Sequence, residues 1–347
     1  KSCDLAEEKA RLVKALPEII EDLAKHPQYA ELPLAKDWMK KVLNGNVTGG
    51  KLTRGLTTVI SYKTVEKPEN LTEETIRQAQ VLGWCTELFQ AYCVVLDDIA
   101  DGSQTRRGQP CWYRREDVGI ANAVNDASLI YYCIHQILQR NFEEMPIYVK
   151  LFQAFNDTLF HTSVGQFLDI RGSESKNKYE LFTRDNYEAI IKHKTAYYTY
   201  KLPISVGLLL ANQLQGETLR NCEDISLQLG RLFQIQDDYI DCFGDESLTG
   251  KNGTDIQEGK CSWPAVNALL RCNARTRTVF LTCYGSKEPA HIERIKQLYV
   301  QQKIPLLYKE EERQIYNDII HKIGAISSSA ERELFQKLLD MTYDRKK

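Results

Sequence analysis

The sequence predicts an all-α fold in a single domain that spans residues 1–347. Apolar residues recur at spacings of three and four in most segments, which is the helical period. No βαβ alternation and no internal repeat is visible, and no Pro-, Gly- or Ser-rich linker divides the chain. With 43% hydrophobic and 27% charged residues, the chain can bury an ordinary core.

The N-terminal half contains the two best-defined predicted helices. Residues 5–23 carry apolar side chains at helical spacing, and Pro17 predicts a break or kink. A longer helix begins near Asn70, where Thr72 offers a cap and acidic residues follow it. It can run to Asp101 and stop at Gly102, about 45 Å at 1.5 Å per residue. Residues 90–96 are apolar almost all round, which is typical of a buried helix.

Further helices are expected along the C-terminal half. One begins near Asp185 and runs through Lys194 to Pro203, where a kink is expected. Another runs from about Asp224 to Asp241 and ends near Gly244. Residues 57–62 and 276–283 are rich in β-branched side chains, so their assignment as helices is the weakest of the series.

Composition excludes several classes of function. The net charge of -2 argues against nucleic-acid binding. The longest apolar stretch, residues 202–214, contains Pro203 and is too short to span a bilayer. Ten cysteines include no CxxC pair, and the six histidines show no metal-ligand spacing. Reduced thiols in the cytoplasm are expected, although a removed targeting segment upstream of Lys1 stays open.

Two aspartate motifs carry the strongest chemical signal. They are Asp97-Asp98-x-x-Asp101 and Asp237-Asp238-x-x-Asp241, each at the end of a predicted helix. Positions i and i+4 share a helix face, and the helix C-terminus is itself partially negative. A cation would relieve both repulsions, and clustered carboxylates suit Mg²⁺ that shares substrate phosphates. A solvated acidic helix end is the alternative for either motif alone. The residues after Asp237 lack the glycine and glutamate of an EF-hand.

Basic residues near these motifs could meet a phosphate. Lys51 and Arg54 lie in the glycine-flanked segment 49–55. Gly45-x-x-x-x-Gly50-Lys51 has P-loop spacing, but Leu52 stands where a P-loop has Ser or Thr, and no clear strand precedes it. This argues against an NTPase and leaves a phosphate cradle built from backbone amides and charge. Other bases follow the two motifs: Arg106 and Arg107 after the first, Lys251 and Lys260 after the second. Surface salt bridges are the alternative reading.

Long strings of residues resemble the short-chain trans-isoprenyl diphosphate synthases, and most closely the animal type, insects included, that makes farnesyl diphosphate. They are Gly49-Gly-Lys-x-x-Arg-Gly55, the segment from Asp97 to Tyr113, Lys194-Thr-Ala-Tyr-Tyr198, Phe233-Gln-Ile-Gln-Asp-Asp-Tyr-Ile-Asp241, and Thr249 to Gln257 with Lys260-Cys-Ser-Trp263. The resemblance covers most of the chain from Gly49 onward.

The resemblance implies the isoprenoid synthase fold, with about ten helices around a central active-site cavity, and a homodimer. Asp97, Asp101 and Asp237 would bind Mg²⁺, three ions per site, with Asp241 in support; Mn²⁺ or Co²⁺ are alternatives. The implied substrate residues fall into three groups: Arg106, Lys194 and Lys251 for the allylic diphosphate; Gly50, Lys51, Arg54, Gln90 and Arg107 for isopentenyl diphosphate; and Thr195 and Gln234 for the carbocation. Lys260 is a further expected substrate-binding residue.

The implied reaction joins isopentenyl diphosphate to dimethylallyl and then geranyl diphosphate. The allylic C–O bond ionises, the alkene attacks the cation, and the released diphosphate takes the proton, so no histidine base is needed. Tyr92 and Cys93 hold the positions that limit chain length in the family. Cys93 either enlarges the pocket or leaves a gap that neighbouring side chains fill.

Other functions fit parts of the pattern. A terpene synthase would use the same aspartates but needs no isopentenyl site, so the retained Lys51, Arg54, Gln90 and Arg107 favour chain elongation. A geranyl diphosphate synthase is a further alternative. A non-catalytic partner subunit is disfavoured because both aspartate motifs are intact. The basic tail of residues 345–347 could cover the isopentenyl site, although Asp344 weakens this match.

Overall fold

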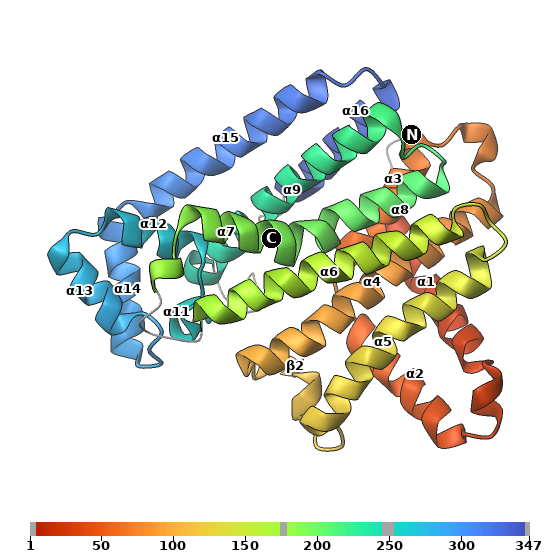
Figure 1. Cartoon of the computed structure of the whole chain (residues 1–347), viewed down its shortest axis with the longest axis horizontal. Helices are drawn as coiled ribbons and strands as arrows, with labels where there is room; N and C mark the ends of the chain where they lie inside the picture. Colours follow the sequence, from red (N-terminus) through yellow and green to blue (C-terminus); the bar gives the residue numbers. More distant parts are fainter. Residues whose placement is uncertain (1–4, 174–178, 245–252, 344–347) are drawn as a thin grey trace. The chain divides into compact units, whose positions relative to one another are not determined.

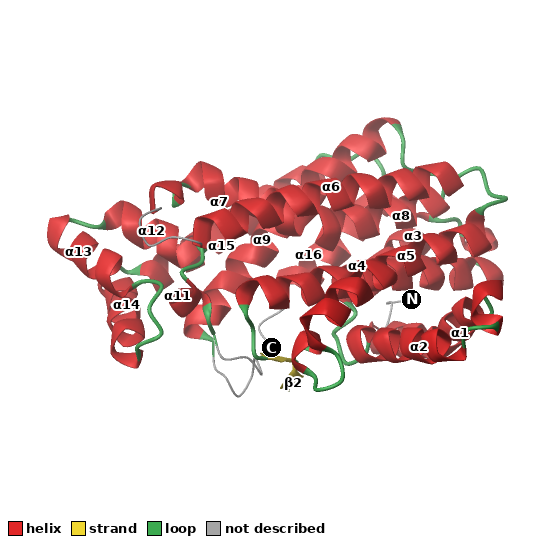
Figure 2. Ribbon diagram, turned by 60° about the horizontal axis from the view of Figure 1, so that its bottom comes forward, coloured by secondary structure: helices red, strands yellow, loops and turns green. Residues whose placement is uncertain are grey.

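The computed structural model describes residues 5–173, 179–244 and 253–343. These residues are almost entirely helical, and their only strands are the two-residue pair β1 (Thr105–Arg106) and β2 (Gln109–Pro110), which are antiparallel (Figure 2). The all-α prediction is therefore confirmed. The segments with β-branched residues also form helices, since 57–62 lies in α3 and 276–283 in α13.

The elements are named in chain order along the described residues. The α-helices are α1 (Leu5–Ala24), α2 (Pro33–Val47), α3 (Thr53–Val65), α4 (Glu73–Asp101), α5 (Gly119–Phe142), α6 (Tyr148–Ser173), α7 (Arg184–Ile190), α8 (Leu202–Leu210), α9 (Gly216–Phe243), α11 (Asp255–Glu258), α12 (Trp263–Arg271), α13 (Ala274–Cys283), α14 (Pro289–Gln301), α15 (Ile304–Gly324) and α16 (Ser329–Tyr343). Shorter or wider turns are η1 (Pro27–Ala30), η2 (Pro68–Asn70), η3 (Trp112–Arg114), η4 (Tyr179–Leu181) and the π-helix η5 (Ile191–Lys201).

Local signals define the ends of α4 as the sequence predicts. The Thr72 side chain accepts a hydrogen bond from the Thr75 backbone N–H, and the Thr75 side chain accepts one from the Thr72 backbone N–H, which makes a capping box. Gly102 ends the helix with a φ of 64°, a left-handed conformation that glycine adopts without strain. Between these caps, residues 81–89 are all buried, and α3, α5 and α8 pack along the helix (Figure 1).

Three predicted details need correction. Helix α1 continues through Pro17 and ends at Ala24, so there is no break at the proline, and a kink there stays a prediction. Helix α9 begins at Gly216, eight residues before the predicted Asp224. The segment that contains Lys194 is a π-helix between α7 and α8 rather than one α-helix with a kink. Such π-helical turns are rare and occur often at functional sites.

The chain groups into two compact units. Unit 1 consists of residues 1–159, 198–223 and 328–334, and unit 2 of residues 160–197, 224–327 and 335–347. In unit 1, α3, α4, α5 and α8 enclose fully buried side chains such as Trp84 and Phe89. In unit 2, α12 to α15 pack together, with Phe280 and Tyr299 fully buried. The single-domain assignment stays a prediction.

Helix α4 is the one described helix that is long and apolar enough to cross a membrane. In its most apolar window, 67% is buried inside the protein. A core helix has the same composition, so this is weak support for a membrane span. The nine described cysteines are all free thiols.

Candidate functional site

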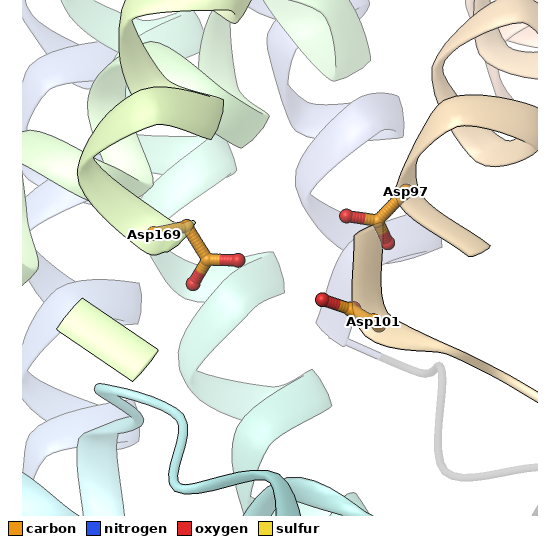
Figure 3. A group of neighbouring side chains, drawn as sticks. All are labelled: Asp97, Asp101 and Asp169. Atoms are coloured by element: carbon orange, nitrogen blue, oxygen red, sulfur yellow. The ribbon is translucent and has the colours of Figure 1, made fainter. Parts of the chain in front are cut away.

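The first aspartate motif divides its side chains between two directions. Asp97 and Asp101 are half-exposed, project from the same side of α4, and place carboxylate oxygens within 4.8 Å of one another (Figure 3). Asp98 is buried at 2% exposure and accepts hydrogen bonds from Arg106, with Nε at 3.1 Å and Nη2 at 2.5 Å. The two outer aspartates are therefore the ones available to a cation.

The hairpin after α4 sends two neighbouring arginines to different partners. Its turn residues, Arg107 and Gly108, have φ of 53° and 72°, as a tight type I′ turn requires. Arg106 turns to Asp98, while Nη1 of Arg107 donates to the Thr48 carbonyl at 2.6 Å. Burial lowers the pKa of Arg106, but the hydrogen bonds and charge of Asp98 raise it more, so this arginine stays charged.

A basic cluster forms in unit 1 around the start of α3, and we define it as Gly50, Lys51, Arg54 and Arg107. A Cβ on Gly50 would lie 2.9 Å from Nη2 of Arg107, so the arginine lies directly over this glycine. Arg54 is buried; its Nη2 donates to Thr199 Oγ1 at 2.8 Å, and its guanidinium lies 4.5 Å from the Tyr198 ring centroid.

Gln90 and the proposed chain-length residues follow on α4. The Oε1 atom of Gln90 is buried and has no hydrogen-bond partner in the described protein. An orphaned buried acceptor of this kind is costly unless a ligand or water satisfies it. Two residues later, the Tyr92 ring lies 5.3 Å from the Tyr131 ring of α5. Cys93 is half-buried beside it.

The second aspartate motif, on α9 in unit 2, has the same inner and outer arrangement. Asp237 and Asp241 are half-exposed, whereas Asp238 is 5% exposed. Asp238 accepts hydrogen bonds from the Tyr187 hydroxyl at 2.6 Å, the Gln234 amide at 2.7 Å and the Trp263 backbone N–H at 2.8 Å. Burial raises the pKa of Asp238 to about 7, and the charge of Asp237 adds to this, against the effect of the three donors.

A further acid joins this motif. Asp241 accepts hydrogen bonds from the backbone N–H groups of Thr254 at 3.2 Å and Asp255 at 3.0 Å. Burial raises the pKa of Asp255 well above its ordinary value, and the charges of Asp241 and Asp238 raise it further. Lys260 offsets this only in part. The unit 2 motif thus concentrates negative charge that a cation would stabilise.

The two predicted lysines of unit 2 share one acid that the sequence analysis missed. Lys194 and Lys260 both donate to Oδ2 of Asp169, at 2.6 and 2.8 Å. Asp169 lies near the end of α6 (Figure 3) and is 5% exposed. An aspartate between apolar neighbours, as in Phe167-Leu-Asp-Ile170, is the signal that could have identified it, because a buried acid needs a partner. Lys251 lies outside the described residues.

Lys194 and Thr195 owe their place to close helix packing. A Cβ on Gly165 of α6 would lie 2.0 Å from the Lys194 backbone nitrogen, so only glycine lets α6 approach the π-helix. Thr195 is buried and donates to Gln234 Oε1 at 2.8 Å. Gln234 in turn donates to Asp238, which links the predicted carbocation-facing pair to the second motif.

Comparison with known proteins identifies the family. Residues 36–302 match the polyprenyl synthetase family. The chain belongs to that family. Its relatives include the farnesyl pyrophosphate synthase of Murgantia histrionica, 42% identical over 98% of this chain and 83% of that protein. Farnesyl pyrophosphate synthase 2 of Arabidopsis thaliana is 40% identical over 94% of this chain and 95% of its own.

Solved structures agree with the family assignment. Farnesyl diphosphate synthase of T. brucei, complexed with risedronate, superposes with a TM-score of 0.92 at 31% identity, covering 98% of this chain and 100% of that chain. The resemblance that the motifs predicted is therefore confirmed. The roles of the individual site residues stay predictions.

The residues of this polyprenyl synthetase fit a hard divalent cation. Every candidate ligand atom of both motifs is a carboxylate oxygen, the donor that Mg²⁺ and Ca²⁺ prefer. The close oxygens of Asp97 and Asp101 place two carboxylates side by side at the end of α4. In unit 2, Asp241 accepts a hydrogen bond from the Asp255 backbone, and the pKa of Asp255 is raised first by burial and then by the charge of Asp241. Asp98 and Asp238 are buried and accept hydrogen bonds from protein donors, so the half-exposed aspartates of each motif are the better candidate ligands.

Proposed function

We propose that this polyprenyl synthetase condenses isopentenyl diphosphate with dimethylallyl diphosphate and then geranyl diphosphate, and so makes farnesyl diphosphate. The observation that carries the proposal is the basic cluster of unit 1, in which Arg107 lies over Gly50 and the charge of buried Arg54 acts on Arg107. The near-full-length relatives named farnesyl pyrophosphate synthase support the same activity. The orphaned Oε1 of Gln90 on α4 supports a ligand in this unit.

The cations of the chain act on the leaving diphosphate. Arg106, Lys194, Lys251 and Lys260 are assigned to the allylic diphosphate, where they stabilise the negative charge that develops as the C–O bond ionises. Mg²⁺, three ions per site at Asp97, Asp101 and Asp237 with Asp241 in support, would add Lewis-acid stabilisation of that charge. Asp169 holds two of the lysines before substrate arrives, so they are oriented in advance.

The organic step needs no protein base. The alkene of isopentenyl diphosphate attacks the allylic cation, which forms the new C–C bond, and the proton lost next to it goes to the released diphosphate. Thr195 and Gln234 are assigned to the cation because they present oxygen lone pairs rather than charge. Their mutual hydrogen bond fixes which atoms face the substrate. Water must be kept away, because it would quench the cation.

Product analysis tests this function. Purified enzyme with Mg²⁺, geranyl diphosphate and isopentenyl diphosphate should yield farnesyl diphosphate, and a chelator should abolish the reaction. Omission of isopentenyl diphosphate should leave geranyl diphosphate unconsumed. Release of a hydrocarbon from geranyl diphosphate alone would instead identify a terpene synthase. A product that stops at geranyl diphosphate from dimethylallyl diphosphate would identify the shorter-chain alternative.

A homodimer belongs to the same proposal. Helix α5 exposes Ile120, Val124 and Tyr132, which lie at spacings of four and eight and so share one face. Contiguous exposed apolar side chains of this size usually mark an interaction site. We assign a second copy of the chain to this face. Val124→Glu with Tyr132→Glu should shift the mass measured by light scattering from dimer to monomer. Leu34→Glu, at an exposed leucine on α2, is the matched control and should leave the dimer intact.

A further inference from the structure

Helix α3, which begins the basic cluster, lacks a cap from its own sequence. Its N-cap residue is Leu52, which makes no side-chain capping hydrogen bond and has a left-handed φ of 56°. The first N–H groups of a helix need partners, and together they attract negative charge. A residue far away in the sequence supplies that partner.

Glu87 of α4 caps α3 across the packing interface between the two helices. Its Oε1 accepts a hydrogen bond from the Gly55 backbone N–H at 2.8 Å, and the Arg54 backbone N–H also donates to it. The side chain is 5% exposed. Burial raises the pKa of Glu87, while the charge of Arg54, the two backbone donors and the charge of Arg107 lower it.

A pair of glycines brings Glu87 within reach. A Cβ on Gly83 would lie 3.0 Å from the Gly55 carbonyl oxygen. A Cβ on Gly55 would lie 3.2 Å from the Gly83 carbonyl oxygen and 3.2 Å from Cγ of Glu87. Helices α3 and α4 therefore approach backbone to backbone at this point. Glu87 follows Gly83 by one helical turn on the same face, so its carboxylate arrives at the start of α3.

We propose that Glu87 is a positioning residue for the isopentenyl diphosphate half of the site. It fixes where α3 begins, and thereby the backbone that carries Lys51 and Arg54. Its negative charge attracts both Arg54 and Arg107, whose positive charges repel each other. It also occupies the anion-binding end of α3, so the diphosphate must be bound by the basic cluster instead of the helix terminus. This inference rests on the proposed function of that cluster.

Two effects of removing the charge have opposite signs. Loss of a negative charge near an anion site would by itself tighten diphosphate binding. Loss of the cap and of the charge between the two arginines would displace the groups that bind the diphosphate and weaken binding. Because Glu87 is buried and engaged by two backbone donors, we expect displacement to dominate.

The experiment compares Michaelis constants for the two substrates. Glu87→Gln should raise KM for isopentenyl diphosphate about tenfold, with KM for geranyl diphosphate within about twofold of wild type, and Glu87→Ala should raise the first further. Glu331→Gln is the matched control, because Glu331 is also a buried acid of unit 1 and accepts hydrogen bonds from Thr218 and Asn221. It should lower thermal stability without changing the ratio of the two constants.

Calorimetry with isopentenyl diphosphate alone separates this inference from the proposed function. If wild type binds isopentenyl diphosphate more tightly than Glu87→Gln does, the positioning role is supported even if no condensation occurs. An unchanged affinity in folded Glu87→Gln would reduce Glu87 to a structural cap. Tighter binding would show that only its charge matters. Either of these two results overturns the proposal.

Discussion

The two aspartate motifs end two long helices in the same way, yet their second aspartates are held differently. Asp98 of α4 accepts hydrogen bonds from the charged guanidinium of Arg106. Asp238 of α9 accepts them from three neutral donors, on Tyr187, Gln234 and Trp263. One buried carboxylate is balanced by a charge and the other by dipoles. Burial accordingly leaves the pKa of Asp238 raised to about 7.

The difference shows which part of the protein each motif organises. Arg106 follows Asp98 by only eight residues, so the first motif is braced by its own hairpin. The partners of Asp238 include Trp263 and Tyr187, which are 25 and 51 residues away, at the start of α12 and in α7. The second motif therefore joins helices, whereas the first orders a loop.

The largest expected effect tests what the motifs share. Asp97→Ala and Asp237→Ala should each lower turnover about a thousandfold or more, because the outer aspartates are assigned to the ions that stabilise the leaving group. Circular dichroism should stay unchanged. Asp318→Ala, at an exposed acid that accepts from Gln314 on α15, is the control and should keep full activity. Near-normal rates in either motif variant would remove the metal assignment.

The third aspartates, Asp101 and Asp241, should separate the motifs. Both oxygens of Asp241 accept backbone hydrogen bonds from residues 254 and 255, so part of its role is to hold that segment. Asp101 instead lies with its oxygens near those of Asp97. We expect Asp101→Asn to lower turnover about a hundredfold and Asp241→Asn about tenfold. Magnesium titrations should show the larger rise in half-saturating concentration for Asp101→Asn. The reverse order would contradict the comparison.

Replacing the second aspartate of each motif should change the free energy of unfolding by different amounts. Asp98→Asn leaves the Arg106 cation without its charged partner and should cost about 2 kcal/mol of unfolding free energy, a value reduced from that of a buried pair because Arg106 is 30% exposed. Asp238→Asn keeps one acceptor oxygen, and the Gln234 amide can turn to accept from the new amide, so it should cost less than about 1 kcal/mol. Urea unfolding without metal measures both. A larger loss for Asp238→Asn would show that neutral donors bind the carboxylate more strongly than the arginine does.

Sequence predicted the features whose causes are local. Thr72 and Gly102 mark the ends of α4 because caps act within one turn. The pairing of Asp97 with Asp101 follows from helical periodicity alone. The glycine-flanked Lys51 and Arg54 at the start of α3 could also be recognised, although the contact of Arg54 with Thr199 and that of Arg107 with Thr48 could not.

Features that depend on distant partners were missed. The π-helix is set by close backbone approaches, of Gly165 to Lys194 and of Gly230 to Ala196, which no local propensity encodes. Glu87 contacts Gly55 across 32 residues, and Asp169 contacts Lys260 across 91. The inward turn of Asp238 likewise depends on Tyr187 of another helix. In each case the residue type was visible, but its role is defined only by tertiary packing.

The smallest expected effect concerns the residue one turn before each motif. Four positions before the first aspartate, α4 has Cys93 and α9 has Phe233. Cys93→Phe makes the two helices alike at this position, and it adds a ring close to Tyr92 and to Tyr131 of α5. We expect turnover within about threefold of wild type, since the change replaces no charged group. Products longer than farnesyl diphosphate and the use of bulkier allylic substrates should decline.

Chain-length analysis with geranyl diphosphate and a homologue that carries an extra methyl group checks this expectation. Cys272→Phe adds the same ring at a half-buried cysteine of unit 2 and serves as the control. A product profile unchanged by Cys93→Phe would mean that Tyr131, 5.3 Å from Tyr92, already fills the space that the small side chain leaves. Product length would then be limited by the contact between Tyr92 of α4 and Tyr131 of α5, and the small side chain of Cys93 would have no effect on it.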